Sequence, residues 1–250
     1  MEYKYAGNEN FEDFASGRVI YHMGGTPTFP VRLALEIYER CRQYSVKKTD
    51  ITLYDCCCGG AYMLTVLGFL KNNSISSIYG SDIDMKSLKL AEDNLSLLSE
   101  PGLRRRKEEI EELYASYGKS SHYDALQSIE IIGNLVKKDI KTHVFYQNIF
   151  EVKELPFIPD IIITDVPYGQ MVGWNQEYYS DSPKKVTGYI NQMMNSISRI
   201  CGSDTIICIC SDKKQKIKTD IFQRLEKQLI GKRKFEIFCN SACHHYKIVT

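Results

Sequence analysis

The fold is decided between residues 53 and 62, which read Leu53-Tyr54-Asp55-Cys56-Cys57-Cys58-Gly59-Gly60-Ala61-Tyr62. Residues 51–55 are typical of a buried β-strand that ends in an acid, and the two glycines predict a turn before an apolar helix over 62–71. Such a turn lets the backbone approach a ligand closely and directs the N–H groups of the helix at it. The stretch lacks the Gly-x-Gly-x-x-Gly spacing of a dinucleotide site. It therefore predicts a ligand site of another kind.

Outward from this stretch, short apolar runs alternate with helical patterns. Strands are expected at residues 51–55, 77–82, 142–147, 160–164 and 205–210, and a final antiparallel pair at 235–239 and 246–249. Helices should lie between them, including one over about 85–98. This alternation predicts an α/β, Rossmann-like fold, with a mostly parallel seven-stranded sheet and helices on both faces.

Two segments lie outside this alternation within what we expect to be a single domain over residues 1–250. Residues 1–48 should form an N-terminal extension whose helix begins at Pro30, because the fixed φ of proline suits a first helical position. Residues 99–138 supply no strand, and their charges recur at helical spacing. We expect a helical insertion there. Either it only adds bulk, or its basic end contacts an anionic partner.

Composition limits the possible classes of protein. The chain has 250 residues, 43% of them hydrophobic, and a formal net charge of +1, so no overall charge indicates a partner. No stretch approaches the roughly 20 apolar residues of a membrane span, and the first residues lack the apolar core of a signal peptide. The odd number of cysteines, nine, indicates a reducing compartment. We expect a cytoplasmic monomer without membrane contact.

The cysteines predict no metal site. Three of the nine are consecutive at residues 56–58, and adjacent side chains project in different directions. The cluster of Cys239, Cys243, His244 and His245 lacks the paired ligand spacing of structural zinc sites. Ordinary packing is the expected role of these residues.

A second motif follows the next strand, at Gly80-Ser81-Asp82-Ile83-Asp84. An acid about 20 residues beyond the glycine turn can accept both hydroxyls of a ribose, and we assign that role to Asp82. Ile83 should pack on an adenine face, whereas Asp84 is interpreted as the N-cap of the following helix. A ribose site beside a strand-ending acid suits a nucleoside with a cationic amino-acid end, and S-adenosylmethionine has that shape.

Two further strand ends carry polar residues. Asn148 could hydrogen-bond the adenine edge, with Ile149 against its ring, although a polar strand end followed by core residues is an equal alternative. The fourth motif is the most informative, because an apolar strand leads into Asp165-Val166-Pro167-Tyr168-Gly169. Tyr168 offers a stacking face for an extruded base, Pro167 stiffens the turn, and Asp165 can accept hydrogen bonds from the base.

These motifs carry a resemblance to a known family. The segments Phe29-Pro30-Val31-Arg32-Leu33-Ala34, Cys57-Cys58-Gly59, Leu64-Thr65-Val66-Leu67-Gly68 and Thr164-Asp165-Val166-Pro167-Tyr168-Gly169 resemble the avilamycin-resistance rRNA methyltransferases. The resemblance implies a class I S-adenosylmethionine-dependent enzyme that methylates a guanine of 23S rRNA, with N1 as the implied atom, and that confers resistance to orthosomycin antibiotics. The implied partner is 23S rRNA or the large ribosomal subunit.

The motifs and the resemblance together define the expected site. The catalytic residues are Asp165, Pro167 and Tyr168, and the residues that bind S-adenosylmethionine are Asp55, Cys57, Gly59, Gly60, Tyr62, Asp82, Ile83, Asn148, Ile149 and Asp165. The chain departs from the family at Gly60-Ala61, where Ser-Gly is usual, at Asn148, where Asp is usual, and at Val166, where Leu is usual. None of these changes removes a reactive group.

Positive charge is concentrated in one tract. Between Lys213 and Lys234 there are nine Lys or Arg residues against Asp220 and Glu226, and such a patch can bind RNA phosphates by counterion release. The alternative is a solvated, helix-bearing surface. The RNA-binding residues that we predict are Arg104, Arg105, Arg106, Lys213, Lys214 and Lys216.

Three other functions compete with RNA methylation. An adenine-N6 DNA methyltransferase would share the motif at Asp165, but the chain shows no separate target-recognition domain. A glutamine-N5 protein methyltransferase usually has a second proline where Val166 stands. A non-catalytic RNA-binding module of the same fold would not need Asp55, Asp82 and Asp165 to be intact.

Overall fold

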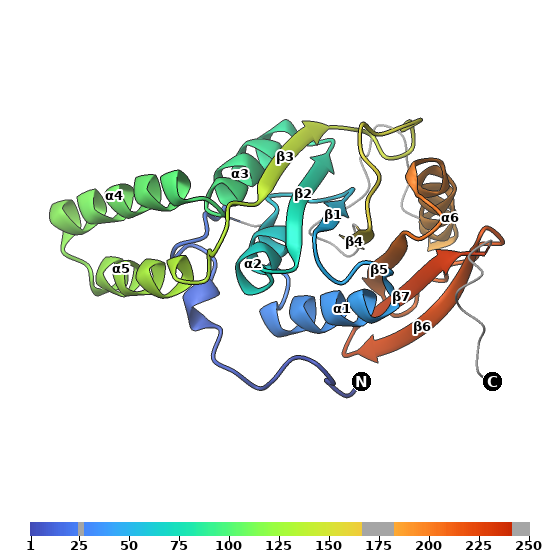
Figure 1. The fold of residues 1–250 in the computed structure, drawn as a ribbon, viewed down its shortest axis with the longest axis horizontal. Coiled ribbons are helices and arrows are strands. Elements are labelled where there is room, and N and C mark those ends of the chain that lie inside the picture. The colour runs from blue at the N-terminus through green and yellow to red at the C-terminus, as the bar shows by residue number, and fades with distance from the viewer. Residues whose placement is uncertain (25–27, 167–182, 242–250) are drawn as a thin grey trace.

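A mixed β-sheet forms the centre of the molecule (Figure 1). The structure, a computed structural model, describes residues 1–24, 28–166 and 183–241, except the side chains of residues 183–187. Within these residues the sheet has seven strands in the order β3-β2-β1-β4-β5-β7-β6. The strands are β1 (Ile51–Asp55), β2 (Ile75–Asp82), β3 (Lys141–Tyr146), β4 (Ile161–Asp165), β5 (Ile206–Asp212), β6 (Phe222–Ile230) and β7 (Arg233–Asn240).

Helices surround this sheet. They are α1 (Val31–Tyr44), α2 (Tyr62–Leu70), α3 (Met85–Ser96), α4 (Glu100–Tyr117), α5 (Ser120–Gly133) and α6 (Pro183–Ile200), with a short 3-10 helix η1 (Glu12–Phe14) before them. The predicted α/β architecture is confirmed, including the strands at 51–55, 77–82, 142–147, 160–164 and 205–210, to within a few residues at their ends. None of the described helices combines the length and the apolar character needed to cross a membrane.

Alternation of side chains along β4 builds a core on each face of the sheet. Ile161 and Ile163 point into the larger core, which includes apolar side chains from α1, α2 and α3. Ile162 points into a second core, which it shares with Met193 and Ile197 of α6. Because these isoleucines are fully buried, both sheet faces exclude water at β4 and the end of this strand is firmly placed.

The strand order creates a crevice at the ends of the central strands. β1 pairs in parallel with β2 on one side and with β4 on the other. The chain therefore crosses from one half of the sheet to the other at β1, and ligands of such sheets bind at this point, beyond the carboxyl ends of the strands. Asp55 ends β1 and Asp165 ends β4, so the two sequence motifs meet there.

The predicted final strand pair is wrong. β7 pairs antiparallel with β5 and with β6, so both of its edges are occupied, and residues 246–249 lie outside the described residues. Its partner β6 comes from the lysine-rich tract, where a dense run of charge obscured the strand pattern. A tight turn at Gly231, with φ of 57°, joins the two strands.

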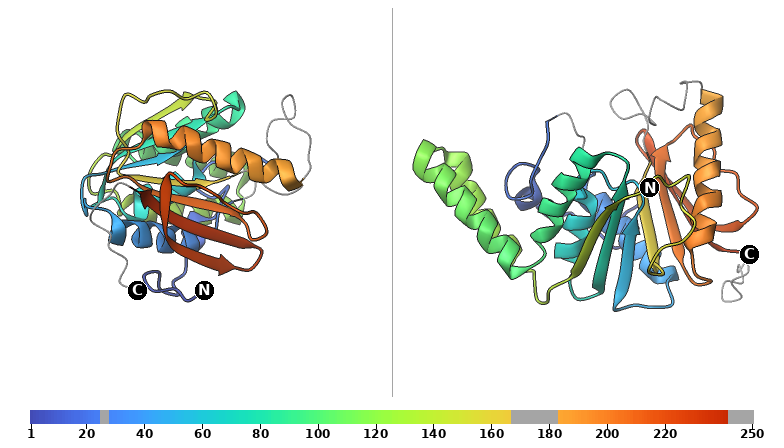
Figure 2. Two further views of the ribbon diagram at one scale, coloured as in Figure 1. Left: turned by 90° about the vertical axis from the view of Figure 1, so that its right-hand side faces the viewer. Right: turned by 90° about the horizontal axis from the view of Figure 1, so that it is seen from above.

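The α4–α5 pair forms a helical hairpin that extends away from the sheet (Figures 1 and 2). Ser99 caps α4 by accepting the N–H of Gly102, and Gly118 ends the helix at a positive φ. The N-terminal segment, residues 11–24, lies against this hairpin, where the Ser128 hydroxyl donates to Asp13 at 2.6 Å and the Tyr21 hydroxyl donates to Glu109 at 2.8 Å.

Candidate functional site

Three carboxylates lie at the ends of neighbouring parallel strands: Asp82 on β2, Asp55 on β1 and Asp165 on β4. Asp55 is 3% exposed. Burial raises the pKa of Asp55 to about 7, and the nearby Asp82 and Asp165 carboxylates act in the same direction, although a hydrogen bond from the Cys57 N–H opposes them. Such a carboxyl group has a strong electrostatic preference for a cationic ligand.

The glycine turn links Asp55 to Asp82. The Gly59 N–H donates to Asp82 Oδ2 at 2.8 Å, and the Cys57 N–H donates to Asp55 Oδ1 at 3.0 Å. Gly59 has a φ of 51°, and a Cβ atom added there would meet nothing within 4 Å. Open space therefore lies over the turn, beside the two carboxylates that the turn connects.

The next two positions, Gly60 and Ala61, differ in packing and in backbone conformation. A Cβ on Gly60 would come within 2.5 Å of Leu90 Cδ2, so a larger residue there requires Leu90 to move. Ala61 has φ of 55° and ψ of 25°, the left-handed conformation that glycine adopts without strain. The turn therefore has its glycine where α3 packs closely and an alanine where the backbone is strained.

We expect Ala61→Gly to raise the free energy of unfolding by about 0.5–1 kcal/mol, because relief of left-handed strain exceeds the added entropy of the unfolded chain. Urea unfolding of the two proteins measures this difference. Ala34→Gly is the matched control, since Ala34 is equally buried but lies within helix α1; it should destabilise by about 1 kcal/mol or more. Equal destabilisation by the two substitutions would contradict the inference that the backbone of Ala61 is strained.

Asp82 and Asp84 make different contacts in the structure. Asp82 Oδ1 accepts the N–H groups of Ile83 and Asp84, at 2.8 and 3.0 Å, and burial raises the pKa of Asp82. With Gly59 on Oδ2, one lone pair of that oxygen is left for a ligand hydroxyl. Asp84 accepts from Lys86 N and Ser87 N, which confirms it as the N-cap of α3. The Ile83 side chain is 37% exposed and available to a planar ring.

The structure gives the polar segment after β3 a different arrangement from the one predicted. Ile149, which we expected to pack on adenine, is only 4% exposed and packs in the second core. Asn148 is half-buried, but its amide bonds locally, accepting from Phe150 N and donating to Glu151. This matches the alternative of a polar strand end followed by core residues.

Two other side chains attach the N-terminal segment to the glycine turn. The Tyr62 hydroxyl donates to the Phe14 carbonyl at 2.7 Å, and burial raises the pKa of Tyr62 to about 12. Asn94, 1% exposed, donates to the Gly60 carbonyl at 2.8 Å and to the Tyr21 carbonyl at 3.2 Å, and accepts the Tyr21 N–H at 2.8 Å. Asn94 was not among the predicted site residues, although an amide on the buried stripe of α3 was a usable signal.

The fourth motif is only partly described. Asp165 ends β4 and is half-buried, and the following Val166 is buried, with its N–H donating to the Cys210 carbonyl at 3.1 Å. Pro167 and Tyr168 lie outside the described residues. Their expected roles therefore stay predictions.

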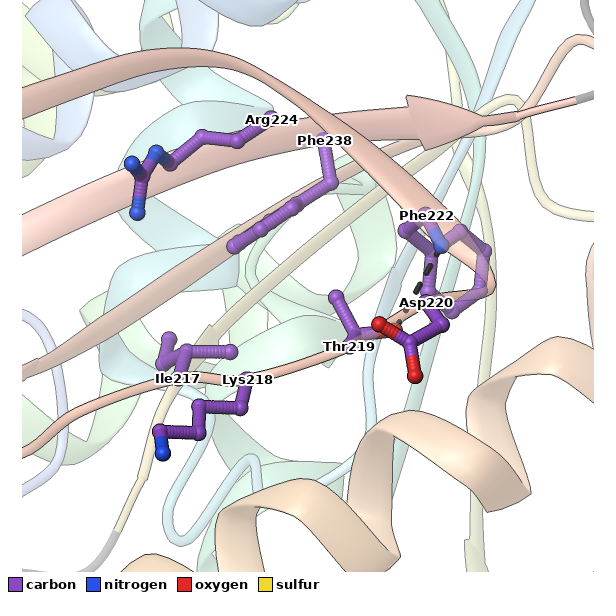
Figure 3. A pocket seen from close by; sticks show the side chains of 7 residues that line it. All are labelled: Ile217, Lys218, Thr219, Asp220, Phe222, Arg224 and Phe238. Carbon is purple, nitrogen blue, oxygen red and sulfur yellow. Dashed lines mark hydrogen bonds between the residues drawn. The ribbon is translucent and has the colours of Figure 1, made fainter.

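The basic tract forms a loop and strand β6, so the helix expected in the alternative of a solvated surface is wrong. A solvated surface itself remains an alternative to RNA binding. Lys213, Lys214 and Lys216 are exposed on the loop, whereas Lys234 is buried beside Glu236 on β7. Arg224 also pairs with Glu236, at 2.8 Å. Lys218 and Arg224 line a shallow pocket of about 390 Å³, with the Phe238 ring between them in the view of Figure 3.

The three predicted arginines of α4 differ in their surroundings. Arg104 and Arg105 are exposed, with Arg104 bonded to Glu100 and Arg105 to Ser96. Arg106 instead donates to the Val19 carbonyl at 2.9 Å and lies over the Tyr21 ring. We therefore assign Arg106 to holding the N-terminal segment on the hairpin.

Among the described residues, no group of three or more His, Cys, Asp or Glu side chains is arranged to hold a metal ion. Cys239 is buried at the end of β7, while Cys243, His244 and His245 lie outside the described residues. Every cysteine that the structure describes is a free thiol.

The sheet order, the glycine turn and the acids at the ends of β1 and β2 together define an α/β enzyme fold of the class I methyltransferase type. The family model described as rRNA methyltransferase AviRa matches residues 1–233. The chain belongs to this family and is an RNA methyltransferase.

Individual relatives agree with this assignment. A 23S rRNA (guanine(2535)-N(1))-methyltransferase of Streptomyces viridochromogenes is 31% identical over 229 residues, which cover 88% of each chain. Two solved structures of the rRNA methyltransferase AviRa from the same organism match with TM-scores of 0.83 and 0.82, at 28% and 30% identity. The first covers 96% of each chain, and the second covers 95% of this chain and 96% of its own.

Proposed function

We propose that this protein transfers a methyl group from S-adenosylmethionine to N1 of a guanine in 23S rRNA, in the cytoplasm and as a monomer, and that the modification confers resistance to orthosomycin antibiotics. The observation that carries the proposal is the set of three carboxylates at adjacent strand ends beside the open glycine turn. Family membership and the activity named for the Streptomyces relative support the choice of substrate.

The residues at this edge fit S-adenosylmethionine. Asp55, buried and with a raised pKa, matches the cationic amino group of the ligand. Asp82 has a lone pair left for a ribose hydroxyl, and the exposed side chain of Ile83 can pack on adenine. Once bound, this cofactor supplies an electrophilic methyl group on a sulfonium centre.

The protein contributes alignment and a proton acceptor. Guanine N1 carries a proton, which must leave before or as the nitrogen gains the methyl group. The Asp165 carboxylate, at the end of β4, accepts that proton, while Tyr168 is proposed to stack on the base. No cysteine lies between Asp165 and Gly169, so this turn does not supply the nucleophile of a covalent pyrimidine mechanism.

RNA binding is assigned to the exposed cations. The exposure of Lys213, Lys214 and Lys216 on the loop before β6, and of Arg104 and Arg105 on α4, supports this assignment. Their contribution should weaken as salt rises, because binding releases counterions.

We expect affinity for S-adenosylhomocysteine to rise between pH 5.5 and 7. In the free protein Asp55, with a pKa of about 7, is largely protonated below that pH, while an ammonium partner favours its ionised form. Binding below pH 7 should therefore release up to about one proton, and affinity should level off above the free pKa. Calorimetry in buffers of different ionisation enthalpy measures the release. The Asp55→Asn variant should bind S-adenosylhomocysteine weakly, with an affinity that does not change with pH. If its affinity still rose between pH 5.5 and 7 as in the wild type, a group other than Asp55 would be responsible for the pH dependence.

Labelled cofactor distinguishes the proposed function from its competitors. We expect label in 23S rRNA when purified protein is incubated separately with rRNA, with duplex DNA and with ribosomal proteins. Label in DNA would indicate the adenine-N6 alternative, and label in protein would indicate the glutamine-N5 alternative. Cofactor binding without transfer to any of the three would contradict the proposal.

A further inference from the structure

A buried amide joins the glycine turn to the N-terminal segment. Asn94, on α3, is 1% exposed. Its Nδ2 donates to the Gly60 carbonyl at 2.8 Å and to the Tyr21 carbonyl at 3.2 Å, and its Oδ1 accepts the Tyr21 N–H at 2.8 Å. Both N–H groups of the amide are therefore engaged, and one of them holds a backbone atom of the turn.

The peptide unit between Gly60 and Ala61 is held from both sides. Its carbonyl accepts from Asn94, and its N–H, that of Ala61, donates to the Cys58 carbonyl at 2.8 Å. Ala61 has a φ of 55°, and a non-glycine residue keeps such a conformation only where its surroundings impose it. The bond from Asn94 reaches this peptide from another helix and so opposes its relaxation.

Strand β2 and helix α3 together hold the turn at two consecutive residues. At the end of β2, Asp82 accepts the Gly59 N–H at 2.8 Å. Farther along, α3 presents Leu90 and Asn94, which are one helical turn apart, to Gly60: a Cβ atom on Gly60 would lie 2.5 Å from Leu90 Cδ2, and its carbonyl accepts from Asn94. The proposed ribose acceptor and the amide therefore act on one short stretch of backbone.

The conformation of this peptide sets the positions of groups that are proposed to bind the cofactor. Gly59, with open space above it, precedes the peptide, and Tyr62, the first residue of α2, follows it. Because each peptide unit is rigid and planar, a rotation at residues 60–61 would move Gly59 relative to the start of α2. Cofactor affinity should therefore depend on what holds this peptide in place.

We infer that Asn94 is a positioning residue for S-adenosylmethionine, an inference that rests on the cofactor of the proposed function. Asn94 is buried and acts through the Gly60 carbonyl, by keeping the turn in the left-handed conformation that places Gly59 beside the carboxylates. A binding site needs such support behind the residues that contact its ligand, because a turn that relaxes in the free protein must be ordered again on binding.

The first test is methyl transfer to 23S rRNA by the Asn94→Ala variant. We expect KM for S-adenosylmethionine and the dissociation constant of S-adenosylhomocysteine to rise about tenfold, the scale of one lost hydrogen bond with a buried partner left unpaired. The value of kcat at saturating cofactor should stay within a few-fold of the wild type. Asn94→Asp keeps the acceptor for the Tyr21 N–H but loses the amide donor to Gly60. It should show the same rise, and it serves where Asn94→Ala does not fold.

Asn72→Ala is the matched control. Asn72 is also 1% exposed, and its side chain makes three bonds to backbone: it accepts from Lys137 N at 2.9 Å and Lys138 N at 3.0 Å, and it donates to the Lys138 carbonyl at 2.9 Å. These contacts lie beyond the far end of α2 from the glycine turn. The variant should lower the melting temperature about as much as Asn94→Ala does and leave KM for S-adenosylmethionine unchanged.

The second test repeats the Asn94 changes in the Ala61→Gly background. Glycine adopts the left-handed conformation without support, so loss of the Asn94 amide should then raise KM for S-adenosylmethionine by less than about threefold. An equal rise in both backgrounds, an unchanged KM in the Asn94 variants, or the same rise in Asn72→Ala would each overturn the inference. Failure of the wild-type chain to bind S-adenosylhomocysteine would instead overturn the proposed function.

Discussion

Replacement of Asp165 by Ala should lower kcat for methyl transfer by about 10²–10⁴-fold, the usual contribution of a positioned general base. Asp165 is the strand-end carboxylate on β4, the strand that leads into the turn of Tyr168. Its loss removes the acceptor for the guanine N1 proton but leaves Asp55, Asp82 and the glycine turn in place. Single-turnover assays with saturating cofactor and RNA measure this change.

Two controls separate a catalytic defect from a binding or folding defect. Asp139→Ala changes an exposed acid before β3, at the opposite edge of the sheet, and should retain wild-type kcat. Because Asp165 is also expected to contact S-adenosylmethionine, Asp165→Ala should bind S-adenosylhomocysteine less tightly, and saturating cofactor removes that effect from kcat. Full activity of Asp165→Ala at saturating cofactor would remove Asp165 from the catalytic step, and a defect that disappears as cofactor is raised would make it a binding residue only.

Replacement of Asp82 by Ala should weaken S-adenosylhomocysteine binding by about 100-fold, since each hydrogen bond to a charged group contributes roughly 1.5–3 kcal/mol. The change removes the ribose acceptor and also frees the Gly59 N–H, which Asp82 Oδ2 accepts at 2.8 Å. Isothermal titration calorimetry gives the dissociation constants directly.

Asp84→Ala is the matched control for Asp82, because the two acids are two residues apart and only Asp82 faces the turn. Loss of the N-cap contacts to Lys86 and Ser87 should cost about 1 kcal/mol of stability but leave cofactor affinity within a few-fold of the wild type. Equal loss of affinity in the two variants would mean that Asp82 acts only through the local fold.

Most of the fold was predictable because its strands are short, apolar and regularly spaced. Ile161 to Ile163 could only be a buried strand, and the acid at each strand end marked the ligand edge. Strand β6 was not predicted, and this has a physical cause. An edge strand can carry Lys and Arg side chains on its solvent-exposed side, so its dense charge is typical of a surface loop or helix as much as of a strand. Pairing β7 with residues 246–249 followed from that error.

The local structure around the candidate site was predictable where it depends on residues that are neighbours in the sequence. Asp82 and Asp84 were separable because an N-cap is defined by the helix that follows it. The burial of Ile149 was not predictable because the sequence does not show which face of the chain turns inward after a strand, and packing in the core that includes α6 decides this. Asn94 was missed because its significance depends on hydrogen bonds between segments distant in sequence.

The most direct test of the account is mass-spectrometric mapping of 23S rRNA from bacterial cells that lack or express this protein. We predict one additional N1-methylated guanosine when the wild-type chain is expressed, and none when the Asp165→Ala variant replaces it. An rRNA modification profile that stays the same with and without the wild-type chain would contradict the account.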